Sequence, residues 1–112
     1  MSFDLAVWYQ PDPLESDAAY SVYDRLTDGD EGVVVRSPAI SAFLEALLLL
    51  YPENGNGASP PWASGVYSNA ECVLLSISWS RSDEVARVVE RVAGENGLSV
   101  FDPQSRVMKN PA

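Results

Sequence analysis

The chain has 112 residues, 46% of them hydrophobic, a size and composition typical of one globular domain with its own core. One cysteine and no histidine exclude an intrachain disulfide, a structural zinc site and any histidine-dependent catalytic triad within a single chain. Sixteen acidic residues against seven basic ones give a formal net charge of −9, which disfavours direct binding to nucleic-acid phosphates.

The N-terminus lacks the pattern of a secretory signal peptide, because the acidic Asp4 follows directly on the first three residues. The longest apolar run, residues 46–51, is much shorter than a membrane span. We therefore expect a single domain over residues 1–112 that is cytoplasmic and does not enter a membrane.

The first third of the chain predicts a strand and then a helix. Residues 3–9 alternate between two faces, as in a strand, and Pro11 and Pro13 end that pattern. Ser16 is a suitable N-cap for a helix of about three turns. The apolar residues of that helix recur at helical spacing: Ala19, Val22, Tyr23 and Leu26.

An acidic turn, residues 27–32, follows this helix. A calcium-binding EF-hand loop needs oxygen ligands at alternate positions and a bidentate glutamate at the twelfth. Asp24, Asp28 and Asp30 do not fit that register. We interpret the turn as a solvated loop without a metal ion.

The next segments predict a leucine-rich helix. Residues 33–35 are all valine and form either a short edge strand or an extended linker. Ser37-Pro38 is a typical helix start, and Pro52 ends the helix. Because Leu49 and Leu50 widen its apolar stripe, we expect burial on more than one side. The stripe itself comprises Ile40, Phe43, Leu44, Leu47, Leu48 and Tyr51.

Residues 53–65 are rich in glycine, asparagine, serine and proline, and predict a flexible loop. Trp62 near its end is either a lid that pins the loop or a contact residue, and we favour the lid. Residues 65–67 are predicted to form a hairpin with the next strand across Asn69-Ala70.

Residues 71–97 predict a central strand and an amphipathic helix. Val73, Leu75 and Ile77 alternate with residues suited to a second, partly exposed face. The helix starts at Ser80 or Ser82 as N-cap and ends at Asn96-Gly97. Two short strands are predicted after it, at residues 98–101 and 106–108.

This order of elements predicts an α+β fold of the ferredoxin-like split β-α-β-β-α-β type, with two helices in the first crossover. The first strand and the strand over residues 72–79 should lie centrally and parallel, with the helices on one face of the sheet. The opposite face would mix Trp8 and Leu74 with polar groups. Such a face needs a cover, either the loop at 53–65 or another protein chain.

Three stretches mark a strand start, a helix cap and a strand exit: residues 1–8 (MSFDLAVW), residues 78–85 (SWSRSDEV), and residues 96–98 with 101–104 (NGL, FDPQ). In this combination the chain resembles small uncharacterised bacterial proteins, some of which resemble toxin-associated immunity proteins. The resemblance skips residues 15–60 and includes no catalytic residue. It implies a companion of a secreted toxin.

The leading functional hypothesis is a non-enzymatic protein-binding module, most concretely an immunity- or antitoxin-like inhibitor of a basic toxin. Residues 1–53 hold ten acidic residues against Arg25 and Arg36, a net charge of −8, which would accelerate encounter with a basic partner. Plain solubility is the competing explanation of this charge. The predicted partner-binding residues are Trp8, Asp12, Glu15, Asp28, Asp30, Glu31, Trp62 and Tyr67.

Two alternatives remain. The first is a ferredoxin-like module that forms a homodimer or binds a small ligand in a pocket lined by Trp8, Leu74 and Trp62. The second is a carboxylate-based enzyme, although each acid close to a predicted strand is more simply a surface residue. Those acids are Asp4, Glu71 and Asp102. We assign no catalytic residue, no cofactor and no metal.

Overall fold

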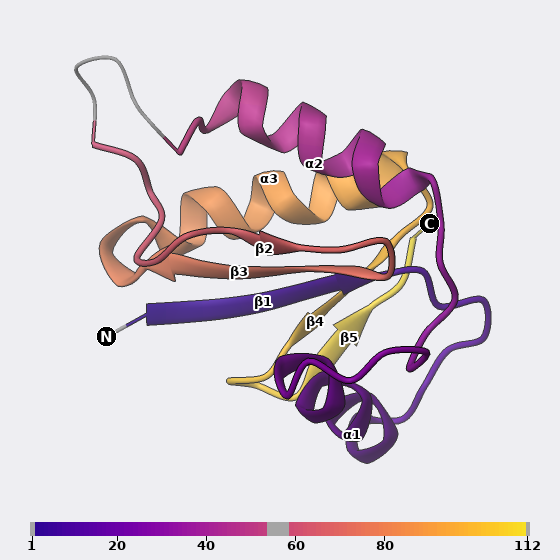
Figure 1. Ribbon diagram of the computed structural model, residues 1–112. Helices are drawn as coiled ribbons and strands as arrows, with labels where there is room; N and C mark the ends of the chain where they lie inside the picture. Colours follow the sequence, from indigo (N-terminus) through magenta and orange to yellow (C-terminus); the bar gives the residue numbers. More distant parts are fainter. Residues whose placement is uncertain (1, 54–58, 112) are drawn as a thin grey trace.

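The computed structural model describes residues 2–53 and 59–111. Within them the chain forms three α-helices, a short 3-10 helix and a five-stranded sheet, which confirms the α+β class (Figure 1). In chain order the elements are β1 (Ser2–Trp8), α1 (Ser16–Thr27), α2 (Ala39–Leu50), β2 (Tyr67–Ser68), β3 (Cys72–Ser78), η1 (Trp79–Arg81), α3 (Ser82–Glu95), β4 (Ser99–Asp102) and β5 (Val107–Lys109).

The strands lie in the order β2-β3-β1-β4-β5, and every neighbouring pair is antiparallel. β1 and β3 pair along their whole length, from Ser2 opposite Ser78 to Trp8 opposite Cys72. The prediction that these two strands are central is confirmed, but the prediction that they are parallel is wrong. The β2–β3 hairpin reverses the chain just before β3, so β3 runs against β1.

The helices cover both faces of the sheet, with α2 and α3 on one side and α1 on the other (Figure 1). The core under α2 and α3 contains Leu5 and Val7 of β1 and three apolar residues of β3. The buried helix residues of this core are Ile40, Phe43, Leu47, Val85, Val89, Val92 and Ala93.

A second core lies under α1, where Ala19 and Leu26 contact a cluster of buried sheet residues. Those sheet residues are Ala6, Trp8, Cys72 and Phe101. The predictions of helices on one face and of an open opposite face are therefore wrong. The long connection of residues 28–38 carries the chain from one face to the other, so two consecutive helices need not share a face.

The leucine-rich helix α2 buries one stripe only. Ile40, Phe43 and Leu47 face the core, whereas Leu49 is 78% exposed and Leu50 is 51% exposed. The expectation of burial on several sides is wrong, because α2 packs mainly on α3 and β3 and leaves its last leucines exposed.

Helix starts differ from the predictions more than helix ends. Glu15, not Ser16, is the N-cap residue of α1, and no side chain caps that helix. The turn η1 precedes α3, and the Ser82 hydroxyl donates to the Trp79 carbonyl (2.8 Å) instead of capping. Gly97 ends α3 as predicted, with a φ of 70°.

The shorter predicted elements are confirmed. The hairpin places Tyr67 of β2 opposite Leu74 of β3, and the chain ends with the pair β4 and β5. Residues 33–35 form no strand and belong to the linker between α1 and α2, which bends at Val33 and Val34. Part of the loop predicted at 53–65 lies outside the described residues. No helix within the described residues is long and apolar enough to cross a membrane.

Candidate functional site

Trp8 is predicted as a partner contact, but its side chain is 0% exposed. The indole packs against Phe101 with ring centroids 6.1 Å apart, and its N–H donates to Gln10 Oε1 (2.9 Å). The expectation that Trp8 is exposed is wrong, because α1 covers this end of the sheet. Trp8 belongs to the core under α1 and does not reach the surface.

The predicted acidic contacts are all exposed and flank α1 on both sides. Asp12 and Glu15 precede the helix, and Asp28, Asp30 and Glu31 follow it. Together with two exposed acids of α1 itself, these residues are here called the acidic α1 surface: Asp12, Glu15, Asp17, Asp24, Asp28, Asp30 and Glu31.

Cations neutralise little of the acidic α1 surface. Among the described residues, Arg25 pairs with Asp30 (3.4 Å) and Arg106 pairs with Asp17 (3.7 Å). Asp24 lies in the last turn of α1 and Asp28 is its C-cap residue. A helix C-terminus carries partial negative charge, so acids there lower helix stability. Asp24 and Asp28 therefore do not stabilise α1, and helix stability does not explain why acids stand at its C-terminal end.

Trp62 lies on the other side of the sheet and acts as the predicted lid. Its half-buried ring packs edge-on against Tyr51, with centroids 6.3 Å apart, and its indole N–H donates to the Tyr51 carbonyl (3.0 Å). Because Trp8 and Trp62 pack in opposite cores, the predicted pocket lined by Trp8, Leu74 and Trp62 does not form.

Tyr67, which is 47% exposed, lines a small cavity that we call the acidic hollow. The hollow has a volume of about 210 Å³ and lies where α1 stops covering the sheet, beside the C-terminal end of that helix. Its lining contains one carboxylate, and no arginine or lysine is among the described lining residues. They are Asp4, Leu5, Tyr23, Thr27, Ser64, Gly65, Tyr67, Leu74, Leu75 and Ser76.

Asp4 is held firmly in the acidic hollow. Its Oδ1 accepts hydrogen bonds from the hydroxyls of Ser2 (3.1 Å) and Ser76 (2.8 Å). The side-chain amide of Gln104 bonds to the Asp4 backbone on both sides: Oε1 accepts from the Asp4 N–H (2.6 Å), and Nε2 donates to its carbonyl (2.8 Å). These two hydrogen bonds join β1 to the turn between β4 and β5, where Gln104 lies.

Tyr23 supplies a neutral hydroxyl to the hollow. Burial raises the pKa of Tyr23, and the nearby negative charge of Asp4 raises it further. The phenol therefore stays protonated near neutral pH and can donate or accept a hydrogen bond. Sequence reasoning treats Asp4 as a surface acid and gives Tyr23 and Ser76 no functional role. Ser76 meets Asp4 only through the register of β1 against β3, and Tyr23 lines the hollow because α1 packs on this face of the sheet.

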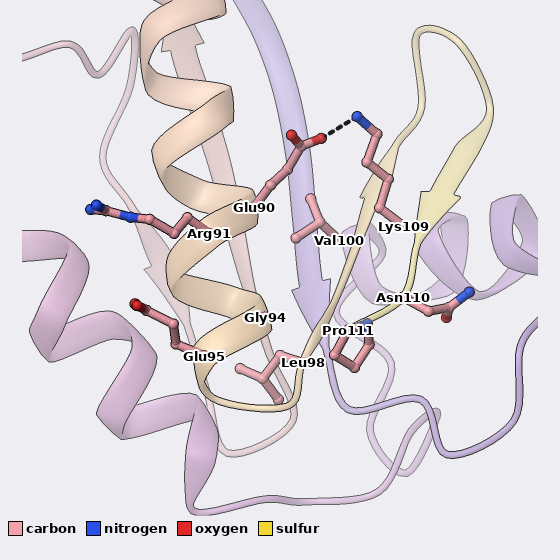
Figure 2. Close-up of a pocket in the computed structure, with 9 residues that line it drawn as sticks. All are labelled: Glu90, Arg91, Gly94, Glu95, Leu98, Val100, Lys109, Asn110 and Pro111. Atoms are coloured by element: carbon pink, nitrogen blue, oxygen red, sulfur yellow. Dashed lines mark ion pairs between the residues drawn. The ribbon is translucent and has the colours of Figure 1, made fainter.

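A larger cavity than the acidic hollow lies elsewhere, between α3 and the β4–β5 pair, with a volume of about 440 Å³ (Figure 2). Leu98, Val100 and Pro111 contribute apolar lining. Glu90 and Lys109 point toward each other across it and form an ion pair, whereas Arg91 extends away. The paired charges neutralise each other.

Glu71 has a structural role. The residue is only 5% exposed. Its Oε2 accepts the N–H of Gly32 (2.9 Å), and its Oε1 accepts those of Val33 (3.1 Å) and Val34 (3.2 Å). The bond from Gly32, followed by that from Val34, lowers the pKa of Glu71. This carboxylate anchors the linker after α1.

Neither a metal cluster nor a relative identifies the function. Within residues 2–53 and 59–111, no three acidic or cysteine side chains are grouped so that they could hold a metal ion. No family model matches this chain, and no curated protein or solved structure is significantly similar to it. The function proposed below therefore depends on the geometry of the chain itself.

Proposed function

We propose that this protein is a non-enzymatic protein-binding module that recognises a basic partner, most concretely an immunity- or antitoxin-like inhibitor of a basic toxin. The observation that carries the proposal is the acidic α1 surface. Its seven carboxylates are all exposed, and within the described chain an ion pair engages only Asp17 and Asp30. The remaining charges are free to attract a partner.

The physical basis is electrostatic complementarity. A region with an excess of one charge accelerates the encounter with a surface of the opposite sign, and it disfavours partners of like charge. Such attraction weakens as salt is added, because exposed charges are screened over about 8 Å at physiological ionic strength. Binding by this surface should therefore fall with increasing salt.

The order β2-β3-β1-β4 and the antiparallel pairing support a finer proposal for the fold. In it, the chain is a variant of the ferredoxin-like split β-α-β-β-α-β pattern. Two features depart from the simple pattern: β5 extends the sheet beyond β4, and α1 lies on the second face. The departure matters for function, because α1 carries the acidic surface.

The test uses two charge variants of the tagged protein. The α1 variant carries Asp24→Asn, Asp28→Asn and Glu31→Gln, and the control carries Glu45→Gln, Asp83→Asn and Glu95→Gln. Each removes three of the same kind of charge, and all six side chains are exposed. Proteins captured from native lysate at low salt are identified by mass spectrometry.

We expect the wild type and the control to retain a basic protein that elutes with salt, and the α1 variant to lose it. The melting temperature of the α1 variant should not fall, since two of its substitutions remove negative charge from a helix C-terminus. Equal capture by both variants would contradict the proposal, as would recovery of no protein at low salt.

The alternative is a module that binds a small ligand, and the 440 Å³ cavity beside α3 favours it. Its volume falls within the range of about 300–1,000 Å³ for ligand sites. The residues differ from those predicted, since Leu98 and Val100 replace the tryptophans as apolar lining. A strict monomer in sedimentation velocity would count against the dimerising form of this alternative.

A further inference from the structure

We propose that the acidic hollow receives a lysine side chain of the basic partner. This inference rests on the proposed function and assigns the contact that gives it specificity. The hollow opens beside the acidic α1 surface: Thr27 of α1 lines it, and the Thr27 hydroxyl donates to the carbonyl of Asp24 (2.8 Å). A chain attracted by that surface meets the hollow directly.

The size of the hollow suits one side chain. Its volume of about 210 Å³ is below the roughly 300–1,000 Å³ of clefts that hold drug-sized ligands. Leu74 and the rings of Tyr23 and Tyr67 provide apolar lining for a methylene chain. Long charged side chains bury their stems along such surfaces while the charged end finds a polar partner.

The charge of the hollow favours a cation. Among the described lining residues, Asp4 is the only charged one. Two serine hydroxyls donate to Oδ1, while within the described residues no side chain or backbone group donates to Oδ2. Tyrosine rings beside a carboxylate also favour a cation over a neutral group.

The pattern of hydrogen bonds favours an ammonium over a guanidinium. A guanidinium binds a carboxylate best through two parallel bonds to both oxygens, but Ser2 and Ser76 already occupy Oδ1. An ammonium is a compact charge with three donors. One can pair with Asp4 Oδ2, and the neutral hydroxyl of Tyr23 can accept another.

The experiment follows backbone amide NMR signals while three small probes are added to the full chain. The probes are Nα-acetyl-lysinamide, Nα-acetyl-argininamide and the uncharged Nα-acetyl-norleucinamide. We expect the lysine probe to bind most tightly and to shift the signals of Asp4, Tyr23, Tyr67 and Ser76. Binding of the arginine probe as tight as that of the lysine probe overturns the inference, and so do shifts confined to other residues.

Variants test the role of Asp4. Asp4→Asn keeps the shape of the side chain and should weaken binding of the lysine probe by about tenfold, the effect of one charge-assisted hydrogen bond. The exposed control Asp83→Asn should leave affinity unchanged. Ser2→Ala with Ser76→Ala frees Oδ1 and should raise affinity for the arginine probe. An unchanged preference in this folded double variant, checked by its melting temperature, contradicts the geometric argument.

The outcomes separate this inference from the proposed function. If the Asp4→Asn variant captures a basic protein as well as the wild type does, the proposed function stands and the lysine site in the hollow is contradicted. If the lysine probe binds but no basic protein is captured from lysate, the cation site stands and the proposed function is contradicted. The last comparison is cadaverine, a free diamine. If cadaverine binds more tightly than a lysine-containing peptide, the hollow is a site for a small amine, and the inference that it receives a lysine side chain of the partner is overturned.

Discussion

The carboxylate of Glu71 shows how one side chain can determine the path of a long connection. It accepts three backbone N–H groups from residues 32–34, which otherwise have no strand to bond with. The linker is thereby held against the sheet, and Val33 and Val34 pack on the core under α1.

Replacing Glu71 with glutamine should lower the free energy of unfolding by about 2 kcal/mol, because charged hydrogen bonds are lost and the new amide N–H₂ group faces backbone donors. The exposed Glu45→Gln is the matched control and should change stability little. Chemical denaturation at neutral pH measures both. A Glu71→Gln variant as stable as the wild type would show that these bonds contribute nothing.

The same residue predicts a pH dependence. The pKa of Glu71 in the folded chain lies below its ordinary value of 4.5, so the folded state favours the ionised form. The contribution of Glu71 to stability is fully present at pH values above its ordinary pKa, and it is lost as the pH falls through the lower pKa of the folded state. The stability difference between wild type and Glu71→Gln should therefore shrink in acid, as followed by thermal melts at decreasing pH.

At the level of elements, α3 has the clearest relation between local sequence and structure. Its apolar residues face the core at helical spacing, and two glycines near its end have different roles. Gly94 lies within the helix, with open space where the Cβ of a larger residue would lie. Gly97 lies just beyond it with a φ of 70°, in the left-handed region that favours glycine.

These two glycines give a matched pair of substitutions. Gly94→Ala should stabilise the protein by about 1 kcal/mol, because alanine has the higher helix propensity and meets no neighbour there. Gly97→Ala should destabilise it by about 1 kcal/mol, since alanine is strained at a positive φ. Thermal melts measure both. Shifts of the same sign would contradict this account of how α3 ends.

The start of an element is harder to predict than its middle. Serines at 16, 80 and 82 are all suitable N-caps by type, yet none of them caps a helix, because η1 tightens the entry to α3 and Glu15 precedes α1. The predicted apolar spacing within α1 and α3 is confirmed. Spacing depends on a whole helix face, whereas a cap depends on one loop conformation.

For the whole molecule, the decisive feature is that helices cover both faces of the sheet. Cys72 tests it, because this thiol lies in the core under α1. Burial, followed by the charge of Glu71, raises the pKa of Cys72 to about 11. The thiolate that reacts with alkylating reagents is then scarce near neutral pH.

Iodoacetamide at pH 8 should label Cys72 in the folded protein more than about a hundredfold more slowly than an unperturbed thiol, given the smaller thiolate fraction alone. In guanidinium chloride the labelling should reach the ordinary rate. Mass spectrometry follows both reactions. Rapid labelling of the folded chain would mean that α1 does not close this face.

The residues of the acidic α1 surface could be predicted individually, since acids in turns and at helix ends are usually exposed. The acidic hollow could not. Asp4 meets Ser76 only through the pairing of β1 with β3, and Gln104 reaches the Asp4 backbone only because the β4–β5 turn lies beside the N-terminal half of β1.

The amino-acid sequence alone determined which segments form strands and helices and which of their faces are apolar, because these properties depend on periodicity over neighbouring residues. Only the tertiary structure decided that β1 and β3 are antiparallel and that α1 lies opposite α2 and α3. Strand direction and helix side depend on the path of the connecting loops, which local patterns specify weakly. That path buries Trp8 and leaves the acidic hollow open.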